Sequence, residues 1–429
     1  MSQRRSTSPG GVGPPGRPDP TRATRRWPWL VALAILIGVA VVVRVATLKP
    51  PDVVLHARLP TTVRLSGSAP TPVWPASGQA ALVVDGLGSL GTAGGDTPAP
   101  TASLAKVMTA YLTLLKYPLS QSGGGFTLMV TAADARAEAQ DVKQDESVVA
   151  VRAGQQLDER QLLEALLIPS GDNIAQMLAA YDAGSVSRFV AEMNSTARAL
   201  GMNRTTYTDP SGFDPSTVSD ASDQLRVLQR AMRFAAFRQI VSMSSATLPV
   251  AGTVENYDPL IPEGYYGKTG SDSAAEGCLA FFKYVTVDGR RLTLVGVVMG
   301  QGYGSTTSVV LGAAAVAAER LVGSVMPALR AHTVVPAHTT VMVATSADGH
   351  RVAVVTSDPL TVIGWGGMRE RLAIRSRRPG IDLSPGQRLG EAQLAGPLPT
   401  SPGQPTQSAI RVVKKLAAPG ISWRLQHLF

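Results

Sequence analysis

Three short motifs occur in a fixed order in this chain, and they must meet in space to act together. The first is S-L-A-K at residues 103–106, the second is S-G-D-N at 170–173, and the third is K-T-G at 268–270. Together they supply two hydroxyls and two ammonium groups, which is the set that a serine acyl-transfer site needs. The fold must therefore bring three distant segments to one place.

The distribution of histidine restricts the chemistry of such a site. The chain has five histidines, His56, His332, His338, His350 and His427, so none lies between residues 57 and 331. A Ser-His-Asp mechanism is therefore excluded for the region that carries the motifs. The base must be another side chain, and Lys106 is the candidate.

Ser103 and Lys106 lie three positions apart at the start of a helix that we expect to extend to Tyr117. Residues at this spacing share one helix face. A lysine accepts the proton of a serine only when it is neutral, which requires burial or cationic neighbours. Taken alone, Ser103 would be interpreted as the N-cap of the helix.

The second motif lies at a Pro-Ser-Gly step between two predicted helices. Alone, Ser170 would be interpreted as another helix cap. In combination with the first motif, it is a second hydroxyl that relays protons to a leaving amine. Asp172 or Asn173 would then hold a substrate amide, and the sequence leaves the choice between them open.

The third motif precedes a predicted strand around Cys278. There, Lys268 with the hydroxyl of Thr269 could bind a carboxylate. Gly270 has no side chain, so the strand edge could approach the substrate backbone closely. Cys278 is the chain's one cysteine, which excludes an intramolecular disulfide and a cysteine-based zinc site.

The net charge of +9 is distributed unevenly along the 429 residues. Residues 1–50 carry +7, residues 51–335 about −4 and residues 336–429 about +6. The region with the motifs is thus mildly acidic, so the basic balance of the whole chain does not argue for a nucleic-acid partner.

The N-terminus has the pattern of a membrane-targeting segment. Residues 1–26 are basic and rich in Ser, Pro and Gly, so we expect a disordered cytoplasmic tail. Residues 27–46 are apolar behind two tryptophans, and no good cleavage site follows them. An uncleaved single-pass anchor is favoured over a cleaved signal. In either case the rest of the chain lies outside the cytoplasm.

Composition predicts three further segments. Proline-rich residues 47–74 are expected to be a linker, and 75–330 the domain that carries the three motifs, built of mixed helices and strands. Short extended runs rich in Val, Thr, Gly and Pro predict a small β-rich domain over 336–429.

Beyond the three motifs, the chain resembles the D-alanyl-D-alanine carboxypeptidases, the low-molecular-weight penicillin-binding proteins of serine peptidase family S11. The resemblance covers roughly residues 75–322. It is carried by Pro100–Ala110, Leu162–Ser170, Phe189–Gly212 with its Asp209-Pro210-Ser211-Gly212, Asn256 with Pro259-Leu260, and Glu276–Leu279. A weaker likeness at Pro385–Gln387, Leu389-Gly390 and Trp423–Leu425 fits the β-rich domain that often follows the catalytic one.

This resemblance implies an antiparallel sheet flanked by helices, an α+β fold of the penicillin-binding and β-lactamase type. It implies cleavage of the terminal D-alanine from peptidoglycan stem pentapeptides, with β-lactams as covalent inhibitors and without metal or cofactor. Ser103 would attack, Lys106 would accept its proton, and the backbone N–H groups of Ser103 and Ser271 would form the oxyanion hole. Lys268 and Thr269 would hold the substrate carboxylate.

Four residues, at three places, depart from the pattern of the family. Ala105 and Asp272 replace two usual threonines, and Asp172-Asn173 replaces Asn-Asp. The last change puts a carboxylate in the amide-binding slot unless the loop shifts to present Asn173. Direct alignment on Ser170 favours Asp172 as the residue in this slot. We therefore expect an enzyme that is active but slower than one with the usual asparagine.

Two alternatives remain at this stage. A class A β-lactamase shares the motifs but adds a glutamate for deacylation, for which we find no matching element. A non-catalytic peptidoglycan-binding or regulatory protein would explain the exchanged Asp172 and Asn173.

Overall fold

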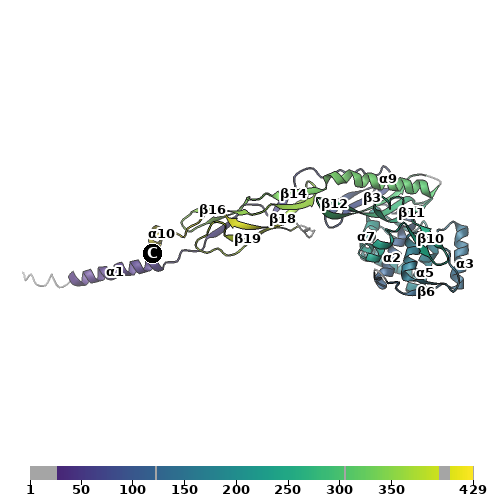
Figure 1. Ribbon diagram of the computed structural model, residues 1–429, viewed down its shortest axis with the longest axis horizontal. Coiled ribbons are helices and arrows are strands. Elements are labelled where there is room, and N and C mark those ends of the chain that lie inside the picture. The colour runs from purple at the N-terminus through teal and green to yellow at the C-terminus, as the bar shows by residue number, and fades with distance from the viewer. Residues whose placement is uncertain (1–26, 121–122, 304–305, 396–405, 429) are drawn as a thin grey trace, which may run out of the picture.

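The computed structural model describes residues 27–120, 123–303, 306–395 and 406–428. The molecule is elongated, with three parts in a row (Figure 1). Helix α1 (Trp27–Thr47) stands at one end, a β-rich part lies in the middle, and a domain of helices and strands forms the other end. The tail expected over 1–26 lies outside the described residues.

The domain farthest from α1 is built on a five-stranded antiparallel sheet. Its order is β11 (Tyr265–Asp272), β12 (Glu276–Val287), β13 (Arg290–Gln301), β3 (Gln79–Val84) and β4 (Gly88–Ala93). The longest pair, β12 and β13, is joined at Asp288-Gly289, where both residues have positive φ. That is the backbone a two-residue hairpin turn requires, and the sequence predicts the turn there.

Helices cover both faces of this sheet. On one face lies α9 (Thr307–Val325), which packs on β12 and β13; on the other lie α7 (Ala221–Ala231) and then α2 (Lys106–Lys116). By length and composition α9 could cross a membrane, as could α1. Its buried side, which includes Ala314, Ala318 and Leu321, instead forms core with the sheet.

A helical lobe is packed beside the sheet and holds the second motif. Its helices begin at caps that the sequence supplies: the Asp158 side chain accepts from the Gln161 N–H, and that of Ser185 accepts from the Arg188 N–H. The lobe and its short hairpins comprise η1 (Ala102–Ala105), α3 (Ala132–Asp141), η2 (Val142–Gln144), α4 (Glu159–Leu167), α5 (Asp172–Ala183), α6 (Val186–Ala199), α8 (Ala235–Ile240), β5 (Ala99–Pro100), β6 (Thr127–Met129), β7 (Gln156–Asp158), β8 (Val218–Ser219), β9 (Ser245–Leu248) and β10 (Gly252–Glu255). The expected mixed fold with an antiparallel sheet is therefore present.

The β-rich part consists of a seven-stranded antiparallel sheet and a two-stranded one. The large sheet has the order β1 (Val54–Ala57), β15 (Thr340–Thr345), β16 (Arg351–Thr356), β20 (Gln407–Val412), β19 (Arg388–Ala395), β18 (Arg369–Ser376) and β2 (Thr62–Arg64). The small sheet pairs β14 (Arg330–Val335), which follows the turn η3 (Met326–Ala328), with β17 (Leu360–Gly364).

The structure differs from the linker expected over residues 47–74. Strands β1 and β2 of this segment form the two edges of the seven-stranded sheet, and Val53 and Leu65 are buried in its core. Neither strand exceeds four residues, so the segment has too little periodicity to be recognised locally. Pairing with β15 and β18, far along the chain, makes these residues strands.

Candidate active site

The first motif lies at the junction of η1 and α2. Lys106 is fully buried, and its Nζ lies 2.8 Å from the Oγ of Ser103. The spacing of three residues puts both side chains on one face, as the sequence predicts. Ser103 itself remains partly accessible.

Three acceptors surround the Lys106 ammonium. Besides Ser103 Oγ, they are Oδ1 of Asp172 at 2.5 Å and the backbone oxygen of Ser211 at 3.1 Å. An ammonium has three N–H donors, and each has a partner here. In this arrangement Lys106 donates to Ser103. It must lose a proton before it can accept the one from the Ser103 hydroxyl.

The Ser211 carbonyl is presented by a loop that Asp209 organises. Oδ2 of Asp209 accepts from the backbone N–H groups of Ser211, Gly212 and Phe213 at 3.0, 2.8 and 3.1 Å. Gly212 has φ +85°, and a Cβ there would lie 1.8 Å from the Ala102 oxygen. Only glycine fits at this contact, which locks the loop against the turn that carries Ser103.

The second motif contributes Asp172 to the site and directs Asn173 elsewhere. While Oδ1 of Asp172 binds Lys106, its Oδ2 accepts from the Ser147 N–H at 2.8 Å. The amide of Asn173 bonds both backbone groups of Val149, at 3.0 and 2.8 Å. Of the two side chains, it is therefore the carboxylate that contacts Lys106, and Asn173 holds a neighbouring segment.

Ser170 occupies a strained position between α4 and α5. Its φ is +66°, which is uncommon for a residue with a Cβ and costs on the order of 1–3 kcal/mol. The side chain is buried, and its Oγ has no hydrogen-bond partner among the described residues. The hydroxyl is thus free for a further partner.

The third motif runs along β11, past the turn that carries Ser103. A Cβ on Gly270 would lie 3.1 Å from the Thr101 oxygen and 3.2 Å from the Ser103 nitrogen. A side chain at Gly270 would therefore crowd the backbone N–H of Ser103. Lys268 and Thr269 are buried, and Lys268 Nζ donates to the Thr269 oxygen at 2.9 Å.

Burial shifts the pKa values of three charged side chains in this region. Burial, followed by the charge of Lys106, lowers the pKa of Lys268 to about 7. Burial raises the pKa of Asp258 to about 6 and that of Glu146 to about 7. Neither carboxyl belongs to a motif. Only the fold brings Asp258 within electrostatic reach of Lys268, and Glu146 within reach of Asp172.

Comparison with known proteins decides the family. The sequence profile of the D-alanyl-D-alanine carboxypeptidase family, peptidase S11, matches residues 77–302. The chain belongs to this family. It is therefore a serine peptidase of the cell wall, as the resemblance predicted.

Two relatives illustrate the extent of the match. The D-alanyl-D-alanine carboxypeptidase DacB2 of Mycobacterium tuberculosis is 33% identical over 243 residues, which is 54% of this chain and 78% of the relative. The D-alanyl-D-alanine carboxypeptidase of Streptomyces sp. strain K15 is 29% identical over 212 residues, 45% of this chain and 71% of the relative.

The fold is also found among solved structures. The crystal structure of the Streptomyces K15 DD-transpeptidase is matched over 100% of its length and 61% of this chain, with a TM-score of 0.50 and 24% identity. This likeness confirms the predicted penicillin-binding type of fold. The family assignment favours the carboxypeptidase over the β-lactamase and the non-catalytic alternatives.

The geometry predicts different effects for substitutions of Asp172 and of Asn173. Asp172→Asn keeps the shape but removes the charge that stabilises the Lys106 ammonium. We expect acylation by a fluorescent penicillin at neutral pH to become faster, by about tenfold for each 1.4 kcal/mol of stabilisation removed. The measurement is the labelling rate of Asp172→Asn at neutral pH, compared with that of wild type.

Asn173→Ala is the matched comparison. It leaves the buried backbone groups of Val149 without partners, so we expect a loss of about 1–3 kcal/mol in the free energy of unfolding. Labelling of the folded fraction should stay close to that of wild type. A slower labelling by Asn173→Ala together with an unchanged rate for Asp172→Asn would contradict the assignment.

Proposed function

We propose that the chain is a serine D-Ala-D-Ala carboxypeptidase that removes the terminal D-alanine from peptidoglycan stem pentapeptides through an acyl-enzyme on Ser103. The observation that carries the proposal is the buried Lys106 Nζ, 2.8 Å from Ser103 Oγ, in a chain of this family. Lys106 is the base, since no histidine lies between residues 57 and 331. β-Lactams acylate the same hydroxyl.

The reaction proceeds in two steps. Ser103 Oγ attacks the carbonyl carbon of the penultimate D-alanine while Lys106, in its neutral form, takes the hydroxyl proton. We assign the oxyanion hole to the N–H groups of Ser103 and Ser271. The assignment is supported by Gly270, the neighbour of Ser271, where an added Cβ would lie 3.2 Å from the Ser103 nitrogen. The C–N bond then breaks, the leaving amine receives a proton through Ser170, and water hydrolyses the ester to restore Ser103.

Substrate binding falls to the third motif. Lys268 and Thr269 hold the terminal carboxylate, and the half-exposed edge of β11 at Ser271 and Asp272 lies along the peptide. Asp172 positions Lys106 and does not donate to a substrate amide, because a carboxylate has no N–H and both oxygens already accept hydrogen bonds. The enzyme is therefore slower than one with an amide at this place.

The Ser103→Ala variant tests the acyl-enzyme. It lacks the nucleophile, so we expect no covalent adduct with a fluorescent penicillin and no release of D-alanine from a pentapeptide. Wild-type protein should carry one adduct per chain, located by mass spectrometry of the labelled peptide. An adduct that persists in Ser103→Ala would overturn the assignment. A wild-type protein that binds peptidoglycan without labelling or D-alanine release would favour the binding-protein alternative.

Lys268 gives the activity a distinctive dependence on pH. Because its pKa is lowered to about 7, the ammonium is lost as the pH rises through that value, and binding of a carboxylate weakens. We expect KM for a peptide with a free C-terminus to rise above about pH 7, and Lys268→Ala to lose about 2–5 kcal/mol of binding. A peptide with an amidated C-terminus is the control. Equal effects on both peptides would assign Lys268 to the chemistry or the structure.

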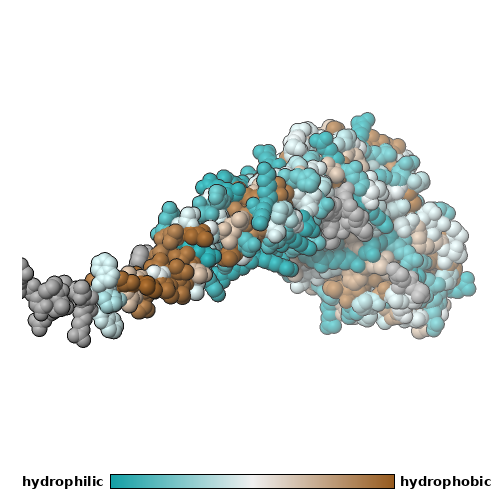
Figure 2. All heavy atoms as spheres, turned by 60° about the vertical axis from the view of Figure 1, so that its left-hand side comes forward, coloured by the Kyte–Doolittle hydropathy of each residue, from teal (hydrophilic) through white to brown (hydrophobic). Residues whose placement is uncertain are grey.

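Helix α1 is proposed to anchor the protein with its N-terminus in the cytoplasm. Its 21 residues span about 30 Å, the thickness of a bilayer core, and none of them is buried by protein. Figure 2 shows the apolar helix extending from a largely hydrophilic body. The basic residues before it favour the cytoplasmic side, which places the peptidase domain on the cell-wall side.

The C-terminus returns to the same end of the molecule. Helix α10 (Ile421–Gln426) lies beside the end of α1, and Arg424 donates to the backbone oxygens of Val45 and Ala46 at 3.4 Å. These carbonyls belong to the last turn of α1, which has no intrahelical donors for them. The contact ties the β-rich part to the anchor.

Mass spectrometry of the mature protein from membranes tests the anchor. We expect a species that retains residues 27–46, because the segment lacks a good cleavage site. A protease added to intact spheroplasts should remove the peptidase domain and spare the N-terminal tail. A mature protein that begins near Thr47 would show instead that the segment is a cleaved signal.

A further inference from the structure

A second cleft of the peptidase domain lies apart from the three motifs. It has a volume of about 590 Å³ and is formed by α7, by Arg238 of α8 and by the facing strands β12 and β13. Four arginines line it, Arg226, Arg230, Arg233 and Arg238, against a single acidic side chain, Asp85. Its charge is thus opposite to that of the mildly acidic domain around it.

The spacing of three of these arginines gathers them on one side. Arg226, Arg230 and Arg233 follow one another at intervals of four and three residues along α7 and the turn after it. Arg226 and Arg230 are neighbours on one face of α7, and Arg233 in the turn lines the same cleft. Like charges at this spacing repel one another, and a negatively charged partner would offset that repulsion.

Two of the four arginine side chains have neither a hydrogen bond nor an ion pair among the described residues. Arg226 is paired with Asp223, and Arg238 donates to the Met232 carbonyl. The side chains of Arg230 and Arg233 have no hydrogen bond or ion pair among the described residues. Asp85 accepts from Gln229 at 3.4 Å. Two guanidinium groups therefore remain available in the cleft.

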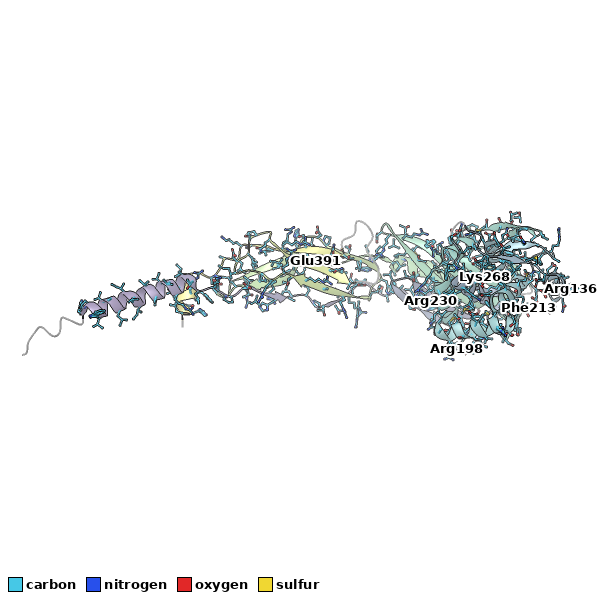
Figure 3. All side chains as sticks on the ribbon, turned by 90° about the horizontal axis from the view of Figure 1, so that it is seen from below. Arg136, Arg198, Phe213, Arg230, Lys268 and Glu391 are labelled. Carbon is cyan, nitrogen blue, oxygen red and sulfur yellow. The ribbon has the colours of Figure 1, made fainter. Side chains whose placement is uncertain are left out.

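The cleft is separate from the candidate active site. Gly270, next to Ser103, pairs with Cys278 on β12, whereas the cleft residue Tyr284 lies six positions further along that strand. At about 3.3 Å per residue this places them about 20 Å apart. In Figure 3 Arg230 lies on the side of the domain toward the β-rich part, and Arg136 lies at the opposite end.

We propose that this cleft binds a ligand with at least two phosphate or carboxylate groups, held by Arg230 and Arg233. The planar guanidinium presents paired N–H donors that match the oxygens of either group. Tyr284, Met232 and Val295 add an apolar wall against which a sugar or aliphatic portion could pack. The volume suits a ligand of small-molecule size.

Isothermal titration calorimetry on the full-length protein in detergent tests the proposal. Inorganic pyrophosphate is the phosphate probe and citrate the carboxylate probe, each at low ionic strength to limit screening. We expect one binding site for at least one probe, and the preferred probe identifies the class of anion. Absence of binding by both probes to wild type would overturn the proposal.

Matched variants locate the site. Arg230→Ala with Arg233→Ala should weaken binding by about 100-fold, because each charge-assisted contact contributes about tenfold or more. Arg230→Lys with Arg233→Lys keeps the charge and should show an intermediate loss. Arg136→Ala, an exposed arginine of α3, should bind as wild type does. The melting temperature of each variant verifies that it is folded. Penicillin labelling should be unchanged in all variants, which separates this site from the proposed activity. Equal losses in Arg136→Ala and the double alanine variant would refute it.

Discussion

The buried ammonium of Lys106 is the interaction on which the organisation of the site depends. It joins α2, the start of α5 through Asp172, and the loop 209–212 through the Ser211 carbonyl. Burying a cation costs several kcal/mol unless partners compensate, and removing one partner leaves that cost uncovered. The helical lobe is thus held to the sheet domain at the point where the three motifs meet.

The ion pair between Lys106 and Asp172 also works against the proton transfer that the site must carry out. A carboxylate 2.5 Å from Lys106 stabilises the ammonium, whereas a base must be neutral to take a proton from Ser103. The neighbouring charges show how the site balances this conflict. Lys268 is repelled by Lys106 and attracted by Asp172 and Asp258, so the two buried lysines are offset by two buried aspartates. Asp172 acts on both cations, so its replacement changes the charge balance around Lys106 and around Lys268.

The sequence predicted what is local and missed what depends on distant contacts. The helix after Ser103 and the Asp288-Gly289 turn follow from short patterns, and the structure confirms both. The sequence left Asp172 and Asn173 as alternatives because adjacent residues point in different directions only once α5 is packed. Strands β1 and β2 were missed, since their pairing partners lie more than 280 residues away. The spacing of Arg226, Arg230 and Arg233 was a visible signal that no motif covered.

The membrane helix, the β-rich part and the peptidase domain follow one another along the long axis of the molecule. With α1 in the membrane, the β-rich part separates the peptidase domain from the bilayer, and the C-terminal helix fixes that part to the anchor through Arg424. Within the peptidase domain Arg230 of the cleft lies on the side toward the β-rich part. Gly270, next to Ser103, pairs with Cys278 near the other end of β12. A rigid antiparallel pair, β12 and β13, thus spans both sites. A ligand bound at the cleft and a peptide bound at Ser103 would be held at a fixed separation, with the cleft on the membrane side.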